Sequence, residues 1–121
     1  MRARWTLCVL LVPLCAVGCG SGGISGSALA DCIGATGREA LFEKNEFLVY
    51  DTVKVRTTDN RARIDLWDDA GKAKESHESE QFDAGPEERA RFALVDNAEV
   101  TWDEVPSAED DSAVMTCLDE S

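Results

Sequence analysis

Apolar and polar residues alternate along several stretches of the chain, and this alternation restricts the fold more than any other feature. Between residues 47 and 55 the odd-numbered positions are apolar, except for Asp51. Ala62, Ile64 and Leu66 repeat the pattern, with charged residues between them. A period of two is typical of a β-strand that buries one face. Further strands are expected at residues 89–95, 99–102 and 113–118.

These short strands predict a mainly β fold, a small β-sandwich. One short helix is expected near residues 37–45, because Thr36 and Glu39 have the spacing of a capping box. Residues 57–60 are expected to form an arch between two sheets. A tight hairpin there would set Lys54 or Arg56 opposite an arginine, and opposed like charges destabilise a strand pair.

One segment carries a resemblance to a known family. Ile64-Asp65-Leu66-Trp67-Asp68 resembles the F-x-L-Y-D signature of a small family of immunoglobulin-like β-sandwich domains common in bacterial envelope proteins. Asp69-Ala70-Gly71-Lys72 is similar to the turn that follows this signature, and Ala84-Gly85 is similar to the glycine turn before the next strand. The resemblance covers residues 47–95. It implies an immunoglobulin-like fold in an extracytoplasmic setting, and it implies no activity.

Residues 1–18 have the organisation of an export signal peptide. Arg2 and Arg4 precede an uncharged, mainly apolar run over residues 5–17. A permanent membrane helix needs about 20 apolar residues, so this run is too short for one. The sequence therefore predicts export from the cytoplasm.

The end of this run, Ala16-Val17-Gly18-Cys19, resembles the lipobox of bacterial lipoproteins, in which the cysteine is acylated and becomes the new N-terminus. Cys19 is the predicted lipidation site. Residues 19–31 are then expected to be a Gly/Ser-rich tether, and residues 32–121 a β-sandwich domain. We expect the protein on the extracytoplasmic face of the cell membrane.

Ordinary secretion is the alternative. Ala28-Leu29-Ala30 is an A-x-A cleavage pattern, and cleavage after Ala30 would release a soluble β domain that begins at Asp31.

The cysteines fit an oxidising compartment. Of the five cysteines, Cys8 and Cys15 lie in the predicted signal peptide and Cys19 is the lipidation site. Cys32 and Cys117 remain and are predicted to form a disulfide bond between the two ends of the domain. Two free, buried cysteines are the alternative.

No residue pattern in the sequence indicates an enzyme. His77, the one histidine, lies in a polar stretch and is interpreted as a solvated surface residue. The sequence holds no nucleophile, phosphate-binding or zinc motif, and its acidic runs lack the spacing of a calcium loop. We therefore expect no cofactor, no metal ion and no catalysis. The net charge of −12 also argues against a nucleic-acid partner.

Acidic residues are concentrated in the second half of the domain. Residues 31–74 hold nine acidic and eight basic residues, whereas residues 75–121 hold fifteen acidic and two basic ones. Long-range attraction of a cationic partner follows from such a field. The predicted acidic binding surface consists of Glu87, Glu88, Glu109, Asp110 and Asp111. Alternatively, the acids serve only solubility. Trp67 and Trp102 are either core residues or exposed contacts.

Our hypothesis from the sequence is a lipid-anchored, non-enzymatic protein of the cell envelope, an interaction module for another protein or polymer. The first alternative is an acidic inhibitor or neutraliser of a cationic extracytoplasmic protein. The second is the secreted soluble domain, and a hydrolase has no support in the sequence.

Overall fold

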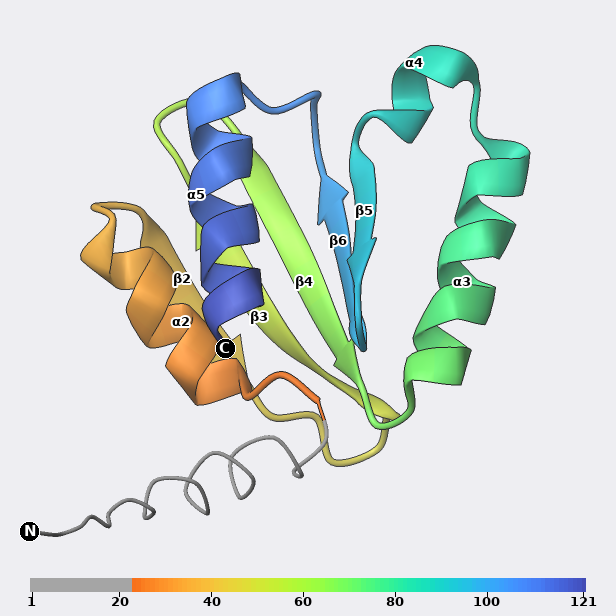
Figure 1. Ribbon diagram of the computed structural model, residues 1–121, viewed down its shortest axis with the longest axis horizontal. Coiled ribbons are helices and arrows are strands. Elements are labelled where there is room, and N and C mark those ends of the chain that lie inside the picture. The colour runs from red at the N-terminus through yellow and green to blue at the C-terminus, as the bar shows by residue number, and fades with distance from the viewer. Residues whose placement is uncertain (1–22) are drawn as a thin grey trace, which may run out of the picture.

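The computed structural model describes residues 23–121 and shows one antiparallel sheet with helices on both faces (Figure 1). The predicted signal peptide and Cys19 lie outside the described residues. In chain order the elements are α2 (Gly26–Ala35), β2 (Glu39–Glu43), β3 (Tyr50–Arg56), β4 (Arg61–Trp67), α3 (Ala70–Asp83), α4 (Pro86–Arg89), β5 (Phe92–Val95), β6 (Ala98–Trp102) and α5 (Ala108–Glu120).

The five strands lie in the order β2-β3-β4-β6-β5, and every neighbouring pair is antiparallel. A tight turn joins β3 to β4, in which the Thr57 N–H donates to the Asn60 carbonyl oxygen at 2.9 Å. Asp96 and Asn97 form a two-residue turn between β5 and β6, and Asp96 takes the left-handed conformation (φ 56°) that such turns require. The helices α3 and α4 connect β4 to β5.

The core lies between one face of the sheet and the helices α2 and α5, which Figure 1 shows on that face. The alternation in the sequence predicts that Val53, Val55, Ala62, Ile64 and Leu66 point inward, and this prediction is confirmed. It is wrong for Phe47 and Val49, which lie exposed before β3, because that strand begins only at Tyr50. In β5, Ala93 and Val95 rather than Phe92 and Leu94 pack against the core. The fully or nearly fully buried side chains of the core include Leu29, Ile33, Val53, Val55, Ala62, Ile64, Val100, Trp102, Val114 and Leu118. Burial of apolar surface at about 25 cal/mol per Å² is the main stabilising contribution here.

The predicted disulfide bond is confirmed. Cys32 of α2 and Cys117 of α5 are bonded, with an S–S distance of 2.08 Å. The bridge joins the two helices that cover the core, across 85 residues of sequence. It therefore restricts the unfolded chain over most of the domain.

The helix predicted near residues 37–45 is wrong, because β2 occupies this segment. Thr36 ends α2 instead of starting a helix, and its hydroxyl donates to the Ile33 carbonyl oxygen at 2.6 Å. Gly37 follows with φ 93°, a left-handed conformation that glycine adopts without strain and that turns the chain toward β2.

The strand predicted at residues 113–118 is also wrong, because this segment lies inside α5. The buried residues Val114, Cys117 and Leu118 have the i, i+3, i+4 spacing of one helix face. Ser107 caps the helix, its side chain accepting from the Asp110 N–H at 3.1 Å. The helix α5 therefore runs from Ala108 to Glu120.

The predicted immunoglobulin-like sandwich is not confirmed. Residues 23–121 form one sheet, and more of these residues lie in helices than in strands. Residues 64–67 of the F-x-L-Y-D-like segment belong to β4. The expected turn at residues 69–72 instead starts α3, because the Asp69 side chain accepts from the Gly71 N–H at 2.6 Å and caps that helix.

The predicted boundary between tether and domain is wrong as well. Ile24 is 8 % exposed and Leu29 is fully buried, so both belong to the core. The Ile24 N–H donates to Asn97 Oδ1 at 2.8 Å, and Ser25 caps α2. The folded domain therefore includes residues 24–31, which the sequence assigned to the tether.

Candidate functional site

The face of the sheet opposite α2 and α5 is covered over only part of its width. The helix α3 packs against β4, β5 and β6 on this face. On β2 and on the end of β3 next to the turn, the corresponding side chains remain in solvent, and Leu41 is 58 % exposed. We call this uncovered region the open sheet face, and it comprises Glu39, Leu41, Lys54, Arg56, Arg61 and Arg63.

Four basic residues stand in two like-charged pairs at the centre of the open sheet face. Lys54 lies opposite Arg63, and Arg56 lies opposite Arg61. The predicted arch through residues 57–60 is therefore wrong, because the hairpin forms despite the opposed charges. The hairpin forms because of the residues on the opposite face of the same two strands. There Val53 packs beside Ile64 and Val55 beside Ala62, and burial of these pairs stabilises the register by more than a like-charged pair costs.

Carboxylates flank the four bases. Lys54 Nζ lies 3.3 Å from Glu43 Oε1, and Arg56 Nε lies 3.4 Å from Glu39 Oε1. On the other side, Arg61 Nε lies 3.9 Å from Asp103 Oδ2. These three pairs are solvent-exposed, so each contributes at most about 1 kcal/mol. The face thus presents a basic centre between two acidic margins.

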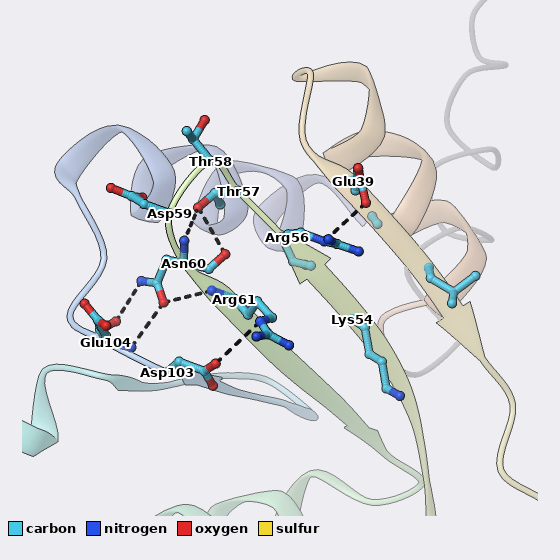
Figure 2. Close-up of a pocket in the computed structure, with 13 residues that line it drawn as sticks. Glu39, Lys54, Arg56, Thr57, Thr58, Asp59, Asn60, Arg61, Asp103 and Glu104 are labelled. Carbon is cyan, nitrogen blue, oxygen red and sulfur yellow. Dashed lines mark hydrogen bonds and ion pairs between the residues drawn. The ribbon is translucent and has the colours of Figure 1, made fainter.

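Next to the β3–β4 turn this face holds a groove with a volume of about 890 Å³ (Figure 2). Asn60 holds its rim in place, since its Nδ2 donates to the Glu104 carbonyl oxygen at 2.8 Å and its Oδ1 accepts from the Glu104 N–H at 3.1 Å. These bonds tie the β3–β4 turn to the segment after β6. Figure 2 shows Arg56 next to its partner Glu39, and Arg61 next to its partner Asp103. The groove therefore has a hydrogen-bonded rim with exposed, charged side chains inside it.

Two buried carboxylates continue this face under α3. Asp65 and Glu99 lie opposite each other on β4 and β6 and are 5 % and 3 % exposed. Ser76 of α3 donates to Glu99 Oε1 at 2.8 Å, and Thr52 donates to Asp65 Oδ1 at 3.2 Å. Burial raises the pKa of both carboxyl groups, and the Arg63 guanidinium partly offsets this effect at Asp65.

Neither carboxylate is indicated as a site residue by the sequence. They occupy the polar phase of their strands, where an acid normally faces solvent, and only the position of α3 buries them. Within residues 23–121 no three His, Cys, Asp or Glu side chains come together in a way that could hold a metal ion.

The predicted acidic binding surface falls into two groups on different elements. Glu87 and Glu88 lie in α4, and Glu109, Asp110 and Asp111 lie in the first turn of α5. Acids in a first helical turn interact favourably with the free N–H groups there. Asp110 is also half-buried and forms a 2.7 Å ion pair with Arg38. Part of the predicted surface therefore has a local structural role.

The aromatic residues and the histidine have separate positions. Trp102 is 2 % exposed and belongs to the core. Trp67 is half-buried on the same face of the sheet as Asp65, with its ring centroid 4.8 Å from that of Tyr50. His77 lies half-buried on α3, and its Nε2 is 3.4 Å from Gln81 Nε2.

Comparisons with known proteins found no match for this chain among protein families, curated proteins or solved structures. The resemblance of residues 47–95 to the F-x-L-Y-D family stays a prediction from the sequence. Among the helices of the described part of the chain, none is long and apolar enough to cross a membrane.

Proposed function

We propose that this chain is a lipid-anchored, non-enzymatic protein on the extracytoplasmic face of the cell membrane, and that it binds a partner protein through the open sheet face. One observation carries the choice of surface. The pairs Lys54–Arg63 and Arg56–Arg61 stand uncovered in the middle of a sheet, although the ten bases of residues 23–121 are outnumbered by twenty-four acids.

Basic residues that face each other on two paired strands destabilise the hairpin. Such a destabilising arrangement is expected at a functional site. A partner carboxylate placed between Arg56 and Arg61 would receive charge-assisted hydrogen bonds from both guanidinium groups. The acidic margins at Glu39 and Asp103 would meet bases on either side of that carboxylate. The complementary ligand is therefore a protein segment with an acidic centre and basic flanks.

Burial in α2 supports an anchor at Cys19 over secretion by cleavage after Ala30. Cleavage there would remove Ile24 and the fully buried Leu29 from the core. It would also remove the first half of α2, and with it the Ser25 cap. A processing site at Cys19 leaves all of these residues in the mature protein.

The neutraliser alternative requires an acidic surface that attracts a cationic protein. The five predicted acids are divided between α4 and α5, so they form two smaller patches. The open sheet face is the more continuous surface, and we prefer it for that reason.

Site-specific photo-crosslinking in the producing cells tests this proposal. A photoreactive amino acid at Leu41 lies on the open sheet face, and one at Phe82 is a control because Phe82 is also exposed but lies at the end of α3. We expect a defined crosslinked product from position 41 and none from position 82. Crosslinking of both positions to the same products, or of neither, would contradict the proposed surface.

A charge reversal tests whether the bases take part. Arg56→Glu with Arg61→Glu should abolish the crosslink from position 41. The matched control is Lys72→Glu with Lys74→Glu on α3, which changes the net charge by the same amount on exposed residues. If both double variants reduce the crosslink equally, only the total charge matters and the surface is misassigned.

A further inference from the structure

The loop between β2 and β3 exposes three consecutive apolar residues. Phe47 is 95 % exposed, Leu48 is 53 % exposed and Val49 is 46 % exposed. Isolated apolar residues are common on protein surfaces, but a contiguous exposed group marks an interaction site. Neither the core nor the open sheet face uses these side chains.

The loop is held in place by polar contacts on its two sides. The Asn45 N–H donates to Asp51 Oδ1 at 3.0 Å, and Asn45 Nδ2 donates to the Tyr50 carbonyl oxygen at 3.0 Å. The Asp68 N–H donates to the Val49 carbonyl oxygen at 3.1 Å. The apolar tip is thus presented by a defined backbone.

The loop lies where the described chain begins. Leu48 and Val49 line the same shallow pocket as Ile24 and Gly26. Figure 1 shows the loop at the end of the molecule where the chain enters α2. Four residues separate Cys19 from Ile24, and this stretch of chain reaches at most about 18 Å. A lipid on Cys19 therefore holds Ile24, and with it the loop, close to the bilayer.

We infer that Phe47, Leu48 and Val49 insert into the interfacial region of the bilayer that carries the Cys19 lipid. This inference rests on the proposed lipid anchor. Aromatic and aliphatic side chains favour this region, where insertion removes their apolar surface from water.

The charges around the loop indicate which bilayer it prefers. Lys44 is paired with Asp51 at 3.8 Å, and Glu46 directly precedes the apolar tip. The loop therefore has no excess of bases to attract anionic headgroups. We expect insertion into zwitterionic lipid, and we expect it to persist at high salt because it depends on apolar burial.

Insertion of the loop would also set the orientation of the domain. The strand β3 runs from Tyr50, beside the loop, to Arg56, beside the β3–β4 turn. Its seven residues span about 20 Å at 3.3 Å per residue. The groove at Arg56 and Arg61 is thereby held away from the bilayer surface, where a partner protein can reach it.

Depth-dependent quenching of tryptophan fluorescence tests the inference. The full chain, processed and acylated by its producing cells, is reconstituted into phosphatidylcholine vesicles with brominated acyl chains. Phe47→Trp is compared with Phe82→Trp, a matched change at another exposed phenylalanine at the far end of α3. The unchanged protein supplies the signal of Trp67 and Trp102, which is subtracted.

We expect the added emission at position 47 to be blue-shifted and largely quenched, and that at position 82 to be neither. Equal quenching at both positions in acylated protein overturns the loop inference and leaves the anchor intact. A mass spectrum without an acyl chain on the purified protein overturns the anchor, and the inference with it. Because both phenylalanines are exposed, neither substitution disturbs the core.

Discussion

Arg56 and Arg61 lie directly opposite each other on adjacent strands, next to the turn that joins β3 to β4. Their repulsion is relieved only in part, because Glu39 pairs with Arg56 at 3.4 Å and Asp103 with Arg61 at 3.9 Å, all in solvent. Binding and stability should therefore respond in opposite ways to a substitution that removes the repulsion. Such a substitution should raise the free energy of unfolding and weaken binding of the proposed partner.

We predict that Arg61→Thr raises the free energy of unfolding by about 0.2–1 kcal/mol, because it removes a like-charged pair and adds a residue that favours strands. The same variant should lose most of the crosslink from position 41. Denaturant titration measures the first effect.

Arg38→Thr is the contrasting variant, since Arg38 is half-buried and pairs with Asp110 at 2.7 Å, so its removal should lower stability. A loss of stability in Arg61→Thr would show that the pair does not oppose folding.

Sequence patterns located the strands whose two faces differ strongly in polarity. β3 and β4 alternate because Val53, Val55 and Ile64 face the core while basic residues face solvent. The disulfide bond was predictable for a different reason: once the three cysteines of the predicted signal peptide and lipidation site are set aside, Cys32 and Cys117 are the pair that remains.

Other elements carry no such signal. The helix α3 buries Ala73, and most of its other side chains are polar and exposed, so it has no apolar stripe to detect. In β2, Leu41 is exposed and Phe42 is half-buried, and alternation over five residues is too short to outweigh a capping-box motif. The open sheet face was not predictable as a site, because its extent depends on which strands α3 covers.

We predict that Glu99→Gln stabilises the protein at pH 7. Burial raises the pKa of Glu99 above 4.5, so the folded state binds this proton more tightly than the unfolded state does. The contribution of Glu99 to the free energy of unfolding is therefore greatest at low pH, and it decreases as the pH rises through the raised pKa. Gln has no charge to bury and can keep the bond with Ser76. Thermal unfolding should show the gain at pH 7 and little gain near pH 4.

The control for this prediction is Glu104→Gln, an exposed acid beyond β6, whose effect on stability should be small at both pH values. An equal effect of Glu99→Gln at pH 4 and pH 7 would show that the carboxylate is not destabilised by burial.

We predict that reduction of the Cys32–Cys117 bond lowers the free energy of unfolding by about 4.5 kcal/mol, the chain-entropy value for a loop of this length. The fold should persist at moderate temperature, because the sheet and its core do not depend on the bridge. Denaturant titrations of oxidised and alkylated reduced protein measure the difference. A change below about 1 kcal/mol would mean that the two helices also remain together in the unfolded chain.

We predict that Leu29→Ala costs about 2–5 kcal/mol, whereas Ala28→Ser, its exposed neighbour in the A-x-A pattern, changes stability little. Leu29 is fully buried in α2, so the loss follows from a cavity in the core. The comparison is made on the exported, mature protein. Equal stability of the two variants, together with a mature N-terminus at Asp31, would establish secretion and remove the anchor from the proposed function.

The last prediction separates the two charged surfaces. Glu87→Lys with Glu88→Lys makes α4 basic, whereas Arg56→Glu with Arg61→Glu makes the open sheet face acidic. If the open sheet face binds the partner, the first variant should keep the crosslink from position 41 and the second should lose it at low salt. The neutraliser hypothesis predicts the opposite order, because it places recognition in the acidic field of the second half of the chain.

The melting temperatures of both variants should stay near that of the parent, since all four side chains are exposed, so that a lost crosslink reports on binding. Loss of the crosslink in the α4 variant alone would transfer the binding surface to the acidic residues that the sequence first indicated.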